Sequence, residues 1–189
     1  MFKFNYNARP RLYVVDNFYE DPMAVRELAL QQEYNFEPWY RGRRTAKQFL
    51  FPGLKERFEE VIGKKITRWE EHGMNGRFQH CTVEDMLVYH CDEQTWAATI
   101  YLTPDAPFQC GTTLWAHKGY KCRGRDEFST KGYAFNAGFL DKTPLEPVDV
   151  VGNVFNRLVI WDAWSIHSAS EYFGMKKENS RLFQIFFFD

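Results

Sequence analysis

The hydrophobic and polar positions divide the chain into a helical first third and a strand-rich remainder. Residues 11–15 form a short run rich in apolar, β-branched and aromatic side chains, which predicts a first strand. Asp21 and Pro22 then form a strong helix start, because Asp caps helices and Pro suits the first helical position. Apolar residues at near-helical spacing follow, and we expect this helix to end near Glu33.

A second helix is predicted over residues 54–62, where apolar side chains share one face: Leu54, Phe58, Val61 and Ile62. Residues 35–47, between the two helices, show no clean period and mix aromatic with basic side chains. We therefore expect a long loop there. Its segment 39–44 is a candidate to close over a bound molecule, since binding residues often lie on loops.

After residue 64 the pattern changes to short strand-like runs separated by turn residues. These runs are 65–69, 76–82, 84–91, 95–103, 111–116, 132–138, 147–151, 155–161, 166–170 and 181–188. Residues 117–131 are polar and predict a loop. Regular short strands with few helices indicate a sandwich or barrel. The sequence thus predicts one mainly β domain, with a helical N-terminal flank at 1–64 and a strand-rich core at 65–189.

Composition narrows the class of protein. A chain of 189 residues with 44% hydrophobic residues can bury a real core as one domain. The net charge of −1 gives no electrostatic reason to expect nucleic acid or an anionic membrane as a partner. No apolar run reaches the roughly 18 residues of a membrane span. The four cysteines form no Cys-x-x-Cys pair and the N-terminus shows no secretory signal, so we expect a cytoplasmic protein without a zinc knuckle.

Two candidate metal ligands, His90 and Asp92, lie in the run 83–92. If this segment is extended, His90 and Asp92 point the same way and can reach one metal. Such a triplet is weak evidence alone, and a third ligand must come from elsewhere. Among the five histidines, His167 is the best choice because it follows the apolar strand 158–161. Two histidines and one carboxylate form the facial triad of non-haem iron(II) oxygenases, which leaves three coordination positions open.

Arg181 strengthens the metal hypothesis. It opens the run 181–188, which is apolar on both faces, and arginine rarely starts such a strand without an anionic partner. Alternation places three apolar residues on its face: Phe183, Ile185 and Phe187. The guanidinium offers a bidentate fork to a carboxylate. An apolar slot with one cation at its end fits a dicarboxylic acid that chelates iron through a 2-oxo acid group.

Five pieces of the sequence together carry a family resemblance: His90-x-Asp92, Thr99–Thr103, Cys110–Thr113, His167 and Arg181. Their order resembles that of prolyl-4-hydroxylase-like Fe(II)/2-oxoglutarate oxygenases over residues 83–189. Residues 15–22 also look like the same stretch in uncharacterised bacterial and phage members. The resemblance implies a double-stranded β-helix, or cupin-like jelly roll, with flanking N-terminal α-helices and the metal at its open mouth.

The resemblance also implies the chemistry. It assigns iron(II) to the triad and gives Arg181, Tyr101, Thr99 and Thr113 to the 2-oxoglutarate pocket. Thr103 replaces the Asn of the family's Tyr-Leu-Asn, and Cys110 replaces the first glycine of its Gly-Gly-x-Thr. Related halogenases lack the carboxylate, so Asp92 favours hydroxylation. The implied reaction consumes O2 and 2-oxoglutarate and releases succinate and CO2 as a C–H bond is hydroxylated.

The oxidised substrate stays open at this stage. An amino acid, a peptide or a small metabolite all fit, and four residues are candidates for the substrate pocket: Trp115, Trp164, Trp39 and Arg41. One alternative is a jelly-roll binding module with a vestigial metal site. Another is a cupin-like metalloenzyme that does not use 2-oxoglutarate. Arg181 favours the oxygenase over the latter, because only the oxygenase needs a buried cation beside the metal.

Overall fold

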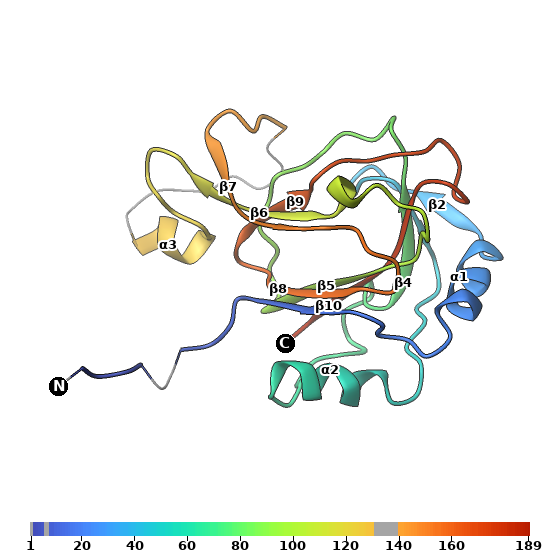
Figure 1. Ribbon diagram of the computed structural model, residues 1–189, viewed down its shortest axis with the longest axis horizontal. Helices are drawn as coiled ribbons and strands as arrows, with labels where there is room; N and C mark the ends of the chain where they lie inside the picture. The colour runs from blue at the N-terminus through green and yellow to red at the C-terminus, as the bar shows by residue number, and fades with distance from the viewer. Residues whose placement is uncertain (1, 6–7, 131–139) are drawn as a thin grey trace.

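The computed structural model describes residues 2–5, 8–130 and 140–189, and this part of the chain is mainly β (Figure 1). The larger antiparallel sheet has the order β1-β8-β5-β10-β4-β3-β2, with strands β1 (Leu12–Val15), β2 (Tyr34–Phe36), β3 (Arg43–Thr45), β4 (Arg77–Cys81), β5 (Trp96–Tyr101), β8 (Leu158–Asp162) and β10 (Arg181–Phe188). The smaller sheet has the order β7-β6-β9, with strands β6 (Thr112–His117), β7 (Leu145–Val151) and β9 (Ile166–Ala169). The predicted mainly β jelly-roll architecture is confirmed.

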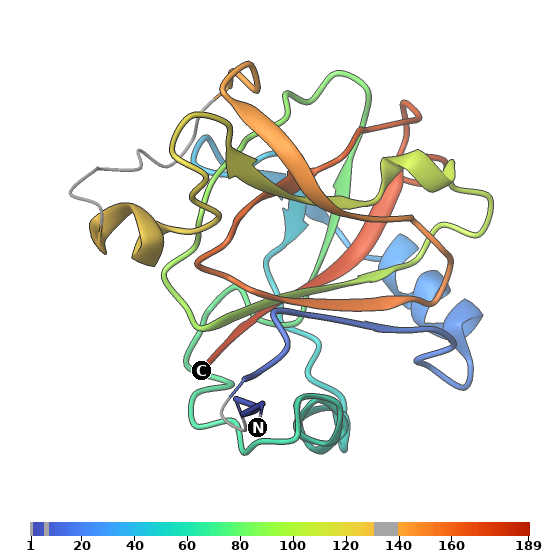
Figure 2. The ribbon, with the colours of Figure 1, turned by 60° about the vertical axis from the view of Figure 1, so that its left-hand side comes forward.

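The two sheets enclose an apolar core, and the helices α1 (Pro22–Leu30) and α2 (Leu54–Ile62) cover the other face of the larger sheet. The smaller sheet lies on one side of β5, β8 and β10, whereas α2 lies on the opposite side (Figures 1 and 2). Leu114 of the smaller sheet packs with Tyr101 and Phe183 of the larger one. Phe58 of α2 packs instead against Phe186 on the outer face. The larger sheet is therefore apolar on both faces.

Strand β10 shows how alternation produces this arrangement. Phe186 and Phe188 pack in the cluster under the helices, whereas Phe183 packs between the sheets. The strand pairs with β4 on one side and β5 on the other, which places it inside the sheet. Its two apolar faces follow from this position, because successive side chains of a strand point to opposite faces.

Both predicted helices are present. The second has the predicted bounds, and α1 (Pro22–Leu30) ends three residues before the predicted end at Glu33. The side chain of Asp21 caps α1 by accepting a hydrogen bond from the amide of Ala24 at 3.0 Å. None of the helices in the described ranges is long and apolar enough to cross a bilayer.

Several strand predictions need correction. The expected loop at 35–47 contributes β2 and β3 to the larger sheet, so the first 64 residues supply strands as well as helices. Runs 65–69 and 84–91 are not strands, and the polar stretch 117–131 contains the helix α3 (Arg125–Thr130). The predicted strand 132–138 lies outside the described residues. A strand forms only where a neighbouring strand accepts and donates backbone hydrogen bonds. The runs 65–69 and 84–91 have no such neighbour along most of their length.

Gly42 anchors the turn between β2 and β3, and it permits a stability test. Its φ is +71°, and a Cβ there would lie 2.2 Å from the carbonyl oxygen of His80. Gly63 has φ +67° but no atom within 4 Å of such a Cβ. We expect Gly63→Ala to lower the free energy of unfolding by about 1 kcal/mol through backbone strain alone. Gly42→Ala should cost about 3 kcal/mol, because the backbone of β4 must also move. Urea denaturation measures both, and equal losses would show that the close contact carries no energy.

Candidate metal centre

The segment that carries His90 and Asp92 is extended without belonging to either sheet. The amide of His90 donates to the carbonyl of His167 at 3.1 Å, and the amide of His167 donates back at 2.8 Å. The amide of Asp92 donates to the carbonyl of Ala163 at 2.8 Å. The first two bonds hold the segment beside β9, and the third holds it to the turn that follows β8. The predicted strand is thus wrong as a strand, but the side-chain alternation on which the site prediction rested is present.

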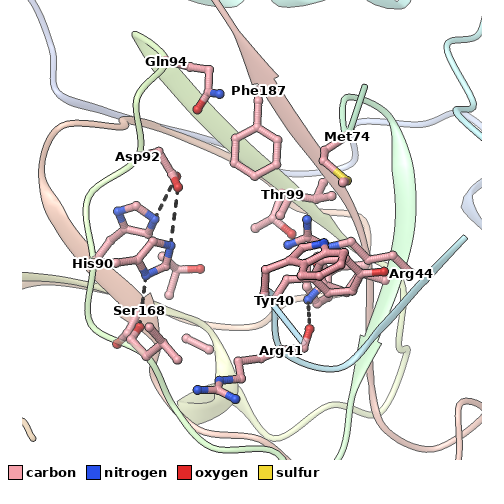
Figure 3. Close-up of a pocket in the computed structure, with 18 of the residues that line it drawn as sticks. Tyr40, Arg41, Arg44, Met74, His90, Asp92, Gln94, Thr99, Ser168 and Phe187 are labelled. Atoms are coloured by element: carbon pink, nitrogen blue, oxygen red, sulfur yellow. Dashed lines mark hydrogen bonds and ion pairs between the residues drawn. The ribbon is translucent and has the colours of Figure 1, made fainter. Parts of the chain in front are cut away.

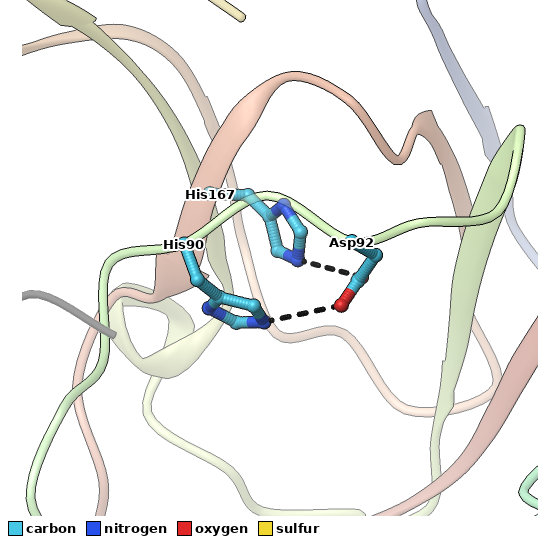
Figure 4. Close-up of side chains that lie close together, drawn as sticks. All are labelled: His90, Asp92 and His167. Carbon is cyan, nitrogen blue, oxygen red and sulfur yellow. Dashed lines mark ion pairs between the residues drawn. The ribbon is translucent and has the colours of Figure 1, made fainter. Parts of the chain in front are cut away.

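The three predicted metal ligands converge on one point (Figure 4). One oxygen of Asp92, Oδ2, lies 3.2 Å from His167 Nε2, and the other, Oδ1, lies 3.5 Å from His90 Nε2. One ligand atom from each residue lies within 4.8 Å of the other two. His167 is buried and the other two are half-buried. The geometry places two imidazole nitrogens and one carboxylate around a single position.

The hydrogen bonds of the two rings show what this position can accept. His90 Nδ1 lies 3.2 Å from the carbonyl of Val88, and His167 Nδ1 lies 2.9 Å from the carbonyl of Ser165. A carbonyl only accepts, so each Nδ1 carries a hydrogen, and Nε2 is the ring nitrogen that each histidine turns towards the centre. Burial lowers the pKa of His90 to about 4, with the neighbouring His167 acting in the same direction, which keeps that ring neutral.

Asp92 is the third side chain of the centre and faces Nε2 of both rings. Its Oδ2 is buried and has no hydrogen-bond partner in the described chain. Burial alone would raise the pKa of Asp92, but His167, His90 and Arg44 together outweigh it, so the pKa lies below its ordinary value. A buried carboxylate facing two imidazole nitrogens is stabilised by a cation. The residues present therefore fit a divalent metal ion with open coordination positions.

The centre opens into a cavity of about 600 Å³ between the sheets. Arg181 and the three apolar residues predicted to share its face, Phe183, Ile185 and Phe187, all line this cavity. Thr99 of β5 lines it as well, and its hydroxyl oxygen is buried without a hydrogen-bond partner. The slot deduced from the alternation of β10 is therefore present, next to the metal ligands.

Arg181 is a buried cation without a neutralising carboxylate. Its side chain donates hydrogen bonds to the carbonyls of Cys110 at 3.1 Å and Gly111 at 3.3 Å. Its guanidinium carbon lies 4.4 Å from the ring centroid of Phe183 and 5.3 Å from that of Tyr101. No Asp or Glu of the described ranges forms an ion pair with it. A charge buried in this way is costly unless an anion binds it.

The other predicted cosubstrate residues lie in different places. Tyr101 is fully buried behind Arg181 and is not at the cavity surface, and its hydroxyl lies 2.8 Å from Thr112 Oγ1. The prediction that Thr113 lines the cosubstrate pocket needs correction. Its hydroxyl lies 2.7 Å from Ser170 Oγ, and the residue is outside the cavity. Thr112 lines the cavity in its place and accepts a hydrogen bond from Arg181 at 3.4 Å.

Two of the four candidate substrate residues line the cavity, namely Trp39 and Arg41. Trp115 does not, because it faces the other side of β6, where its Nε1 donates to Ser168 Oγ at 2.9 Å and its ring contacts Tyr89. Trp164 also lies outside the cavity and stacks under the guanidinium of Arg125 at 4.5 Å. The structure therefore places Trp115 and Trp164 away from the site.

The sequence predictions assigned no role to Thr112 and named Tyr40 and Arg44 only as part of the loop segment 39–44, yet all three line the cavity together with Trp161. The ring of Trp161 lies 5.1 Å from that of His167. A signal existed for this residue, because Val159 and Trp161 alternate with Leu158 and Ile160 in an apolar strand. Arg44 and Tyr40 lie in a segment whose sequence shows no period, so neither had a predicted face.

Searches among family models and among curated proteins find no match to this chain. Solved structures do match. HygX from Streptomyces hygroscopicus with nickel, 2-oxoglutarate and hygromycin B bound superimposes with a TM-score of 0.57 at 12% identity, covering 93% of this chain and 81% of that one. HygX with iron bound gives 0.52 at 12% identity, covering 93% and 80%. A Pseudomonas putida prolyl-4-hydroxylase gives a TM-score of 0.44 at 14% identity, covering 94% of this chain and 91% of that one, and this score is too low to establish a shared fold. The HygX matches show a shared fold.

Proposed function

We propose that this protein is an iron(II)- and 2-oxoglutarate-dependent dioxygenase that hydroxylates a C–H bond of an amino acid, a peptide or a small metabolite. The observation that carries the proposal is the unneutralised, buried Arg181 in the same cavity as the converging His90, Asp92 and His167. A 2-oxo dicarboxylic acid satisfies both features, because one end chelates a metal while the other carries the carboxylate that arginine binds.

Each residue has a defined task in this proposal. His90, Asp92 and His167 hold iron(II) by one face, and Arg181 binds the far carboxylate of 2-oxoglutarate. Tyr101 and Thr112 brace the guanidinium, whereas the free hydroxyl of Thr99 is available to the cosubstrate. Iron(II) held there supplies the reaction of O2 with 2-oxoglutarate, which yields succinate and CO2 and is coupled to oxidation of the substrate.

The apolar cavity wall contributes by excluding water. Phe183, Ile185 and Phe187 lie along the arginine's face of β10, between the cation and the open part of the cavity. A dry wall strengthens the charge-assisted hydrogen bonds of Arg181 and limits side reactions of bound O2. The fold supports the same assignment, since structures of HygX that share it hold iron, or nickel with 2-oxoglutarate.

Anaerobic addition of iron(II) and then 2-oxoglutarate tests the proposal. We expect stoichiometric iron binding, a weak visible charge-transfer band that needs both additions, and succinate after exposure to air. The matched control replaces 2-oxoglutarate by succinate, which lacks the 2-oxo group and should give no band. Iron binding without the band would indicate a metalloenzyme that does not use 2-oxoglutarate. Absence of iron binding would indicate a binding module with a vestigial site.

A further inference from the structure

The cavity wall opposite the metal ligands carries a second arginine, Arg44 of β3. Figure 3 shows Arg44 and Tyr40 across the cavity from His90 and Asp92. No Asp or Glu in the described part of the chain forms an ion pair with Arg44. We propose that Arg44 binds an anionic group, a carboxylate or a phosphate, of the molecule that is oxidised. This inference rests on the proposed function and names its substrate class, a small organic acid or phosphate ester.

The structure holds Arg44 in place by one nitrogen and leaves the other two available. Its Nε donates to Gln79 Oε1 at 2.6 Å, and its guanidinium carbon lies 4.2 Å from the ring centroid of Tyr40. Gln79 is itself fixed, because its Nε2 donates to the carbonyl of Arg41 at 2.6 Å. Neither Nη nitrogen of Arg44 has a hydrogen-bond partner among the described residues. The two free nitrogens form the fork that binds carboxylate and phosphate oxygens.

Charge balance in the cavity favours an anionic substrate. A divalent metal and Arg181 together carry three positive charges, and Asp92 with doubly charged 2-oxoglutarate carries three negative ones. These charges cancel, and the cationic Arg44 remains on the wall, with Arg41 also lining the cavity. Burial lowers the pKa of Arg44 by more than nearby groups such as Asp92 raise it, so desolvation of its charge is only partly compensated. An anion supplied by the substrate would remove that penalty.

The space beside Arg44 defines the rest of the substrate. Figure 3 shows Tyr40 and Met74 on the same side of the cavity as Arg44. Other apolar and aromatic side chains also line this cavity: Trp39, Ile185 and Phe187. A cavity of about 600 Å³ lies within the usual range for small-molecule sites. These features fit a metabolite-sized body that is apolar, with its anionic group on Arg44 and a C–H bond directed at the metal side.

A matched set of three probes tests the inference: 3-phenylpropanoate, 3-phenylpropanamide and 2-phenylethyl phosphate. Each is titrated by calorimetry under nitrogen into protein saturated with iron(II) and 2-oxoglutarate, so that Arg181 is already occupied. We expect at least one anion to bind about 10- to 100-fold more tightly than the neutral amide, as one charge-assisted fork allows. The carboxylate and phosphate arms separate the two sources of the anion.

Two variants assign the preference to Arg44. Arg44→Gln should remove the preference for the anion, and Arg44→Lys should keep part of it. Arg43→Gln is the matched control, because Arg43 is the neighbouring residue of β3, is exposed and lies outside the cavity. Circular dichroism checks folding, and if Arg44→Gln does not fold, Arg44→Lys decides, because loss of the two-nitrogen fork should still weaken binding of the anion relative to the neutral amide. Equal binding of all three probes, no binding of either anion, or an unchanged preference in Arg44→Gln would overturn the inference.

Failure of this inference differs from failure of the proposed function. Succinate formation from 2-oxoglutarate without any probe tests the proposed function alone. If succinate forms but the protein binds the anionic and neutral probes equally, the proposed oxygenase activity is supported and the proposed role of Arg44 is wrong. If no succinate forms, the titrations are repeated on the metal-free protein. If the metal-free protein prefers the anion and Arg44→Gln does not, Arg44 is still an anion-binding residue, although the protein is not the proposed oxygenase.

Discussion

Replacing Asp92 by alanine is expected to weaken iron(II) binding by more than about 100-fold. Outer partners of metal ligands alone are worth about 10- to 100-fold, and Asp92 is the charged ligand itself. The remaining His90 and His167 are neutral donors that cannot compensate the charge of the ion. Anaerobic calorimetry with iron(II) measures the change. Iron affinity within tenfold of the unaltered protein would contradict the placement of the metal at this centre.

The same substitution should have a small effect on the metal-free protein. The pKa of Asp92 lies below its ordinary value, so the folded metal-free protein stabilises the ionised carboxylate, and the variant loses that stabilisation. We expect the metal-free melting temperature to fall slightly, while the increase caused by iron(II) disappears. For the unaltered protein that increase corresponds to about 2.7 kcal/mol at an ion concentration of 100 Kd. Asp149→Asn, at an exposed position of β7, serves as the control and should keep the full metal-dependent increase.

His90 and Asp92 were predictable because their orientation depends on extended backbone and not on a complete strand. Alternation needs only an extended chain, and the backbone hydrogen bonds to His167 of β9 and to Ala163 after β8 keep the chain extended. The sequence could not reveal that run 84–91 lacks partners along most of its length. Partner choice is a property of the whole fold, so the strand was wrong while the ligand geometry was present.

Thr112 and Thr113 show how a shift of one residue changes a site. The resemblance assigned Thr113 to the cosubstrate pocket, but Leu114 pairs with His167 across β6 and β9. Paired residues point to the same face, so Leu114 and Thr112 share the face of His167 and Thr113 points the other way. The register that decides this comes from pairing with a strand more than fifty residues later, which the sequence of β6 does not contain.

Arg44 lies in the candidate loop segment 39–44, but the direction of its side chain could not be predicted, because β3 has only three residues. A strand so short shows no period, and its existence depends on pairing with β4, where Arg44 lies opposite Gln79. Arg181 is the opposite case. It opens an eight-residue strand whose two apolar faces make a charged first residue conspicuous, and the cavity contains it as expected.

Arg181→Met should weaken 2-oxoglutarate binding by about 100- to 1,000-fold, because truncating one side of a buried charge pair costs about 2–5 kcal/mol. Iron(II) affinity should stay within about threefold, since Arg181 makes no contact with the three metal ligands in the described structure. Arg181→Lys keeps the positive charge but loses the two-nitrogen fork, so its affinity for 2-oxoglutarate should lie between those of the unaltered protein and Arg181→Met. Calorimetry of 2-oxoglutarate into the iron-loaded protein under nitrogen gives each affinity.

Loss of affinity must be separated from loss of structure, because Arg181 also ties down the carbonyls of Cys110 and Gly111. Arg26 provides the matched control. It is another buried arginine that donates to two carbonyls, those of Leu102 and Glu178, both at 2.6 Å, but it lies outside the cavity. Arg26→Met should lower the melting temperature as Arg181→Met does, yet leave 2-oxoglutarate affinity unchanged. Similar losses of affinity in both variants would mean that Arg181 acts only through stability, and the cosubstrate assignment would fall.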